Sequence, residues 1–177
     1  MMYARDTFGA DLQHLIKALD GFSQMIGMAL RWLALAMVMI QFLIVVARYV
    51  FGLSDVAMQE TVLYLHATLF MLGAGYTLLV NGHVRVDIFY SRLGPTGQRR
   101  IDLFGHVFLL MPTMVTLMYW SWPAVTNSWG ILEGPISVGG IKGVFFLKSL
   151  IPAFCVLLLL QSASEVLRIF TGEKPRD

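Results

Sequence analysis

Residues 61–80, TVLYLHATLFMLGAGYTLLV, contain no Asp, Glu, Lys or Arg, and this stretch decides the class of the protein. About 20 apolar residues of α-helix cross a bilayer core about 30 Å thick, so the stretch predicts a transmembrane helix. Outward along the chain, comparable spans are predicted at residues 30–50, 103–125 and 144–166. We therefore expect an all-α integral membrane protein with four transmembrane helices, in a single membrane domain that covers residues 1–177.

The composition agrees with a membrane protein and argues against a soluble domain and a nucleic-acid-binding protein. Hydrophobic residues make up 57% of the chain and charged residues 14%, far from the averages of soluble domains. A formal net charge of +2 is too small to indicate nucleic-acid binding. The single cysteine, Cys155, leaves no partner for an intrachain disulfide.

The segment before the first span is amphipathic. Asp11, Lys17 and Asp20 lie on different faces from a set of apolar residues that recur at helical spacing. We expect an N-terminal amphipathic helix that lies in the membrane interface; a solvated leader is the alternative. The apolar positions are Leu12, Leu15, Ile16, Leu19, Phe22 and Ile26.

Local signals refine the spans. Asp55 is a predicted N-cap for the second helix, and Gly73 and Gly75 within that helix favour close helix packing in lipid. Pro112 predicts a kink in the third span, and Pro123 is expected to mark the end of that span, where the helix weakens.

Basic residues are distributed unevenly between the connectors. If the N-terminus is cytoplasmic, ten Lys and Arg residues lie on the cytoplasmic side and three on the outer side. Cytoplasmic loops of membrane proteins carry the excess of Lys and Arg. We therefore expect both termini and the 82–100 connector to be cytoplasmic, and the 127–143 connector to lie outside.

Catalytic and cofactor motifs are absent from the sequence. It contains no H-E-x-x-H, no Walker A and no glycine-rich nucleotide fingerprint. No serine or threonine has a base at a readable spacing. We expect a protein that is not an enzyme and that holds no cofactor or metal.

Two histidines in or near the spans raise one alternative, a membrane-anchor, cytochrome b-like subunit of an electron-transfer complex. His66 and His106 differ in depth by on the order of 15 Å at a helical rise of 1.5 Å per residue. A single haem iron would need both rings at one depth. We therefore expect His66 to be a hydrogen-bonded packing residue and His106 an interfacial residue.

The spans carry little of the chemistry that moves ions. Proteins that conduct charge place ionisable residues deep in the membrane, whereas Arg48 and Glu60 fall at helix ends here. These two residues would pair with each other, contact a partner subunit or be solvated separately. His83, Arg85 and Asp87 at the inner interface are either loop polar residues or contacts to a partner.

Several of these residues stand in an order that resembles a known family. Arg48-Tyr49-Val50-Phe51-Gly52 is followed by Glu60, by Gly73-Ala74-Gly75 and by Gly82-His83-Val84-Arg85-Val86-Asp87. In identity and spacing, this series resembles the signature of the small, DctQ-like membrane subunit of tripartite ATP-independent periplasmic (TRAP) transporters. The four-span architecture extends the resemblance over almost the whole chain.

The resemblance implies a division of labour within a transporter of the bacterial inner membrane. This chain would be the small permease subunit and would brace a large, elevator-type membrane subunit. The large subunit would take up a small organic acid, delivered by a periplasmic solute-binding protein and driven by an ion gradient. The candidate subunit-interface residues are Arg48, Glu60, His83, Arg85 and Asp87.

Overall fold

The computed structural model describes residues 3–83, 90 and 92–171, with side chains from residue 11 onward. Over these residues the chain is helical and contains no strand. Four helical segments are long and apolar enough to cross a membrane, which confirms the predicted all-α membrane class.

Helix α1 runs from Tyr3 to Phe51 as one helix of 49 residues, roughly 70 Å long at 1.5 Å per residue. The segment expected to form a separate interfacial helix is therefore continuous with the first span. No proline lies between Asp11 and Phe51 to interrupt the helix. Gly27 serves close packing, because a Cβ there would lie 2.4 Å from ring atoms of Tyr76.

Helix α2 covers Val56–Leu79 and begins at the predicted cap. The backbone N–H of Ala57 donates a hydrogen bond of 3.2 Å to Asp55 Oδ1. The predicted small-residue contact is confirmed at Gly75, where a Cβ would lie 3.3 Å from Leu157 Cβ on α6. This glycine lets α2 and α6 approach closely.

The third span is a continuous helical rod of three parts: α4 (Pro95–Phe104), the π-helical turn η1 (Gly105–Leu110) and α5 (Met111–Gly130). The π-helical turn ends two residues before Pro112, where the sequence predicts a kink. The N–H of Met111 donates to the carbonyl of His106. The expectation that Pro123 marks the end of the span is wrong, because α5 continues to Gly130. A proline removes only one intrahelical hydrogen bond, and the residues after it continue the helix.

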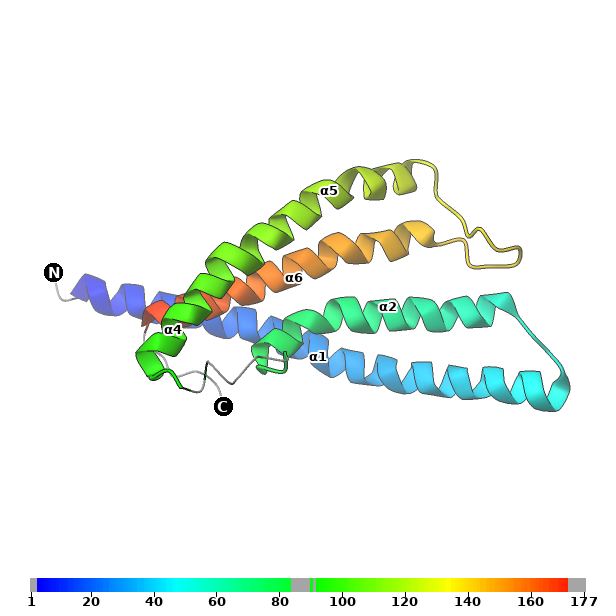
Figure 1. The fold of residues 1–177 in the computed structure, drawn as a ribbon, viewed down its shortest axis with the longest axis horizontal. Helices are drawn as coiled ribbons and strands as arrows, with labels where there is room; N and C mark the ends of the chain where they lie inside the picture. Colours follow the sequence, from blue (N-terminus) through cyan, green and yellow to red (C-terminus); the bar gives the residue numbers. More distant parts are fainter. Residues whose placement is uncertain (1–2, 84–89, 91, 172–177) are drawn as a thin grey trace.

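Helix α6 (Val144–Thr171) is the central element, in contact with α1, α2 and α5. Figure 1 shows two helical hairpins, α1–α2 and α5–α6, that converge at one end and fan apart toward the other. The fanned end carries the 52–55 turn and the 131–143 loop, and we call it the loop end. The opposite end carries the start of α1, the end of α6 and α4, and we call it the terminal end.

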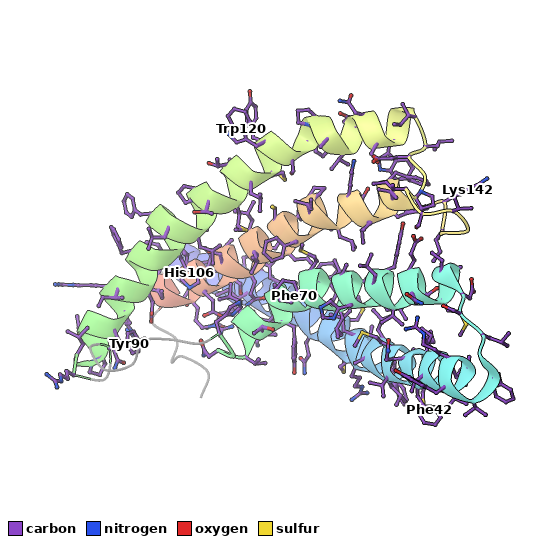
Figure 2. All side chains as sticks on the ribbon, turned by 45° about the vertical axis from the view of Figure 1, so that its right-hand side comes forward. Phe42, Phe70, Tyr90, His106, Trp120 and Lys142 are labelled. Carbon is purple, nitrogen blue, oxygen red and sulfur yellow. The ribbon has the colours of Figure 1, made fainter. Side chains whose placement is uncertain are left out.

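Apolar side chains cover the outside of the bundle (Figure 2). Phe42 on α1, Phe70 on α2 and Trp120 on α5 are all exposed. A soluble protein rarely exposes apolar surface on every helix. The outer surface is therefore suited to lipid or to a membrane partner.

Candidate functional site

A buried polar cluster joins α1 to α6 at the terminal end. Arg168 forms a salt bridge with Asp20 through Nη2 and Oδ2. Asp20 Oδ1 accepts hydrogen bonds from Gln161 Nε2 at 3.1 Å and from Ser164 Oγ at 2.8 Å. Ser23 Oγ donates to Gln161 Oε1 at 2.7 Å. We call these five residues the terminal clasp.

The clasp follows from helical spacing on both helices. Gln161, Ser164 and Arg168 lie three and four residues apart, so they share one face of α6. Asp20 and Ser23 lie on the corresponding face of α1. The Asp20 and Arg168 side chains are only 4% and 6% exposed, so the ion pair is shielded from water.

Sequence reasoning missed this cluster. It placed Asp20 on a different face of an amphipathic helix from the apolar residues, whereas Asp20 is buried against α6. The available signal was the series of polar residues with helical spacing in the last turns of α6, Gln161, Ser164 and Arg168. The sequence did not reveal their partner, because Asp20 lies 148 residues before Arg168.

The two histidines of the haem alternative lie in different environments, and that alternative is not supported. His66 is exposed on α2, and no hydrogen bond to its ring is found within the described part of the chain, so the packing role expected for it is wrong. The position is exposed, and no other helix in the described part of the chain covers it. His106 Nδ1 lies 2.9 Å from Ser162 Oγ, so its ring bonds to α6 within the third span (Figure 2).

A second polar cluster lies at the loop end, where the 131–143 loop meets α2. Glu60 accepts a hydrogen bond from Ser137 Oγ through Oε1 and one of 2.6 Å from the Ile141 N–H through Oε2. A Cβ at Gly140 would lie 2.4 Å from Glu60 Oε1, so a side chain there would force the carboxylate or the loop to move. We call Glu60, Ser137, Gly140 and Ile141 the loop clasp.

Two further contacts fix the base of the loop. Lys148 Nζ lies 2.5 Å from Glu133 Oε2, and Trp129 Nε1 donates a 2.8 Å hydrogen bond to Ser149 Oγ. The hydrogen bond from Lys148 lowers the pKa of the Glu133 carboxyl below its ordinary value. The loop is thus held to both α2 and α6.

The three predicted interface residues that the structure describes, Arg48, Glu60 and His83, are not brought together. Arg48 is exposed, and its Nη2 lies 3.5 Å from Ser54 Oγ. Among the described residues no ion pair joins Arg48 to Glu60, whose carboxylate binds the loop instead. His83 is exposed at the other end, and Arg85 and Asp87 lie outside the described residues.

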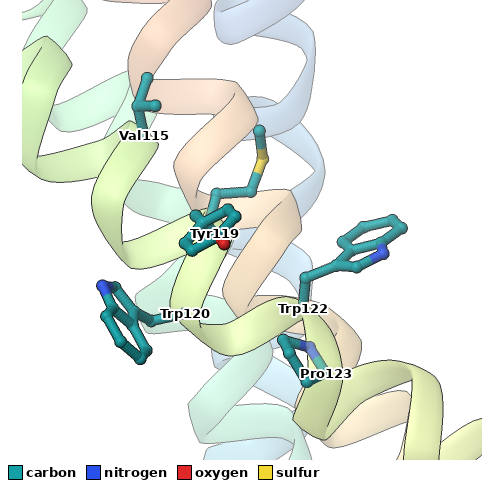
Figure 3. Close-up of a pocket in the computed structure, with 6 residues that line it drawn as sticks. Val115, Tyr119, Trp120, Trp122 and Pro123 are labelled. Atoms are coloured by element: carbon teal, nitrogen blue, oxygen red, sulfur yellow. The ribbon is translucent and has the colours of Figure 1, made fainter.

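An apolar groove of about 610 Å³ runs along α5 (Figure 3). Its lining includes Tyr119 and Trp120, which are each 74% exposed, and Pro123. No acidic or basic side chain lines it. The groove is therefore an apolar feature of the exposed surface of α5.

Comparison with known families gives one match that covers most of the chain. The family described as tripartite ATP-independent periplasmic transporters, DctQ component, matches residues 37–172. The matched range contains Arg48, the loop clasp and Arg168, whereas Asp20 precedes it. A search of curated proteins finds no match.

Proposed function

The chain belongs to the DctQ component family of tripartite ATP-independent periplasmic transporters, and from this membership we propose how it works as the small permease subunit. The chain braces a large, elevator-type membrane subunit. The large subunit carries a small organic acid by symport with an ion, and a periplasmic solute-binding protein delivers the solute. The family match is the observation that carries this proposal.

The surface chemistry of the spans supports a bracing role. Residues 61–80 and 103–125 contain no Asp, Glu, Lys or Arg, and 32–47 contain none either. Ion pathways use ionisable groups at such depths. The exposed aromatic and aliphatic side chains of α1, α2 and α5 suit contact with lipid and with another membrane protein.

The proposed location is the bacterial inner membrane, with the terminal end in the cytoplasm. The ten-to-three distribution of basic residues supports this orientation. We place the N-terminal part of α1 at the cytoplasmic interface, because Leu15, Phe22 and Met25 are exposed there while the opposite face packs on α6. An exposed apolar strip beside charged residues suits the boundary between lipid and water.

The proposed contacts with the large subunit are Arg48 at the loop end and His83, Arg85 and Asp87 at the terminal end. Arg48 and His83 have exposed side chains that a partner could reach. Glu60 contributes through the 131–143 loop that it binds. These residues support assembly and do not bind the solute.

Co-purification of the complex tests this assignment. Arg48→Ala and Arg85→Ala should reduce the recovery of the large subunit with this chain. Lys142→Ala removes an exposed charge at the same end as Arg48 and is the matched control, which should leave recovery unchanged. An intact complex with altered solute affinity in the Arg48 and Arg85 variants would show that the assignment is wrong.

A further inference from the structure

The loop clasp uses both oxygens of one carboxylate inside the chain. Ser137 donates to Glu60 Oε1, and the Ile141 N–H donates to Oε2 at 2.6 Å. Hydrogen bonds to an ionised acceptor are shorter and stronger than neutral ones. The Glu60 carboxylate is therefore placed to hold the loop.

The loop backbone is shaped around this carboxylate. A Cβ on Gly140 would lie 2.4 and 2.5 Å from the two carboxylate oxygens, closer than real contacts permit. Gly139 precedes it with φ +86°, a left-handed conformation that favours glycine. Consecutive glycines thus let the chain turn tightly over the Glu60 side chain.

The Ser137 contact also orients the tip of the loop. The side chains on either side of Ser137 point away from the protein, and Ile136 and Val138 are 106% and 96% exposed. Ser137 alone of the three turns inward, toward Glu60. Loss of its bond would release the tip from this orientation.

The clasp joins the two hairpins at the end where they fan apart. The hairpins fan apart toward the loop end, and α5 packs on α6, not on α2 (Figure 1). In the described residues the hydrogen bonds of Glu60 tie the α5–α6 connection to the start of α2.

We propose that Glu60 is a positioning residue that fixes the 131–143 loop on α2, and that its effect on assembly passes through the loop. The second half of this proposal rests on the proposed function, because it assumes a large membrane subunit. The alternative is direct contact between the Glu60 carboxylate and that subunit. The two possibilities differ in which substitutions weaken the complex.

Hydrogen exchange at the Ile141 amide of the purified chain tests the clasp without any partner. Glu60→Gln leaves one acceptor oxygen for two donors. Gly140→Ala forces the loop and the carboxylate apart but keeps the charge of Glu60. Both should raise Ile141 exchange on the order of 10-fold to 100-fold, the range expected for losing a hydrogen bond to a charged group. Ser137→Ala should raise it less, because the Ile141 bond remains.

Gly134→Ala is the matched control, because the same change in the same loop meets nothing within 4 Å. It should leave Ile141 exchange unchanged. Unchanged exchange in Glu60→Gln and Gly140→Ala would refute the clasp. This readout is independent of transport, so it holds or fails separately from the proposed function.

Co-purification with the large subunit tests the second half. Glu60→Gln and Gly140→Ala should both reduce recovery of the complex, and Gly134→Ala should not. If Glu60→Gln loses the complex while Gly140→Ala keeps it despite faster exchange, the carboxylate contacts the partner directly and the proposal is wrong. Full recovery in both variants, with raised exchange, would equally refute a role of the clasp in assembly.

Discussion

The terminal clasp gives the sharpest stability prediction. The carboxylate of Asp20 and the guanidinium of Arg168 form a pair whose side chains are 4% and 6% exposed. Removing one partner leaves the other charge buried without its counter-ion, which typically destabilises a protein by about 3–5 kcal/mol. Arg168→Met should therefore lower the free energy of unfolding by about that amount.

Asp20→Asn removes the charge of this side chain but keeps an oxygen that accepts hydrogen bonds, so it separates the two contributions to stability. In the native chain, Gln161 and Ser164 donate hydrogen bonds to Asp20 Oδ1, and the amide oxygen of the asparagine can still accept both. The substitution leaves Arg168 with Glu165, whose Oε1 lies 3.5 Å from Arg168 Nη1, as an acidic neighbour. The loss should again be about 3 kcal/mol, at the lower end of the range for broken buried pairs.

The double variant Asp20→Asn with Arg168→Met distinguishes a pair from two separate effects. Once both charges are gone, no buried charge lacks a partner. The free energy of unfolding of the double variant should therefore fall by less than the sum of the decreases in the two single variants. The expected coupling energy is about 2–3 kcal/mol. Lys17→Met is the control, because Lys17 is exposed on α1 and its loss should change stability by less than about 0.5 kcal/mol.

Equilibrium unfolding in mixed micelles, with increasing sodium dodecyl sulfate and circular dichroism as readout, measures these differences. Hydrogen exchange over residues 11–28 should rise in both single variants, because the clasp holds this part of α1 to α6. Additive losses, or single-variant losses below about 1 kcal/mol, would refute the reasoning.

Three further predictions concern packing, pH and orientation. Gly75→Leu should destabilise the chain by about 1–3 kcal/mol in the same unfolding assay, because the space against Leu157 is already filled, whereas Gly105→Ala, with nothing within 4 Å, should be tolerated. The Glu133 carboxyl has a lowered pKa in the folded chain, so the contact with Lys148 contributes stability above the ordinary pKa of 4.5 and is lost only as the pH falls through the lower folded value. Carboxyl NMR titration should show this, and Lys148→Met should raise the Glu133 midpoint; an unmoved midpoint contradicts it. A cysteine at Thr96, in a Cys155→Ser background, should resist impermeant labelling in cells with a permeabilised outer membrane. Labelling at this position would show that the proposed orientation is wrong.

The helices were predictable because their signal is local. Each span is a run of about 20 residues almost without charge, and Asp55 stands where an N-cap is needed. The continuity of α1 was not predicted, because an amphipathic pattern fits a helix lying in the interface as well as one that continues the span. The π-helical turn before Pro112 likewise has no residue pattern of its own.

The two clasps could not be predicted because their partners are far apart in sequence. Glu60 and Ile141 are separated by 81 residues, and Asp20 and Arg168 by 148. The residue types alone allowed Glu60 to pair with Arg48, the basic residue nearest to it in sequence. Only the path of the 131–143 loop over α2 shows that Glu60 meets Ser137 and a backbone N–H instead.

Uptake by reconstituted vesicles tests the central claim most directly. Vesicles that hold this chain alone should transport nothing. Vesicles with the large subunit, this chain and the binding protein should take up a small organic acid on an imposed ion gradient, with no dependence on ATP. Equal uptake by the large subunit and binding protein without this chain, or uptake by this chain alone, would contradict the account.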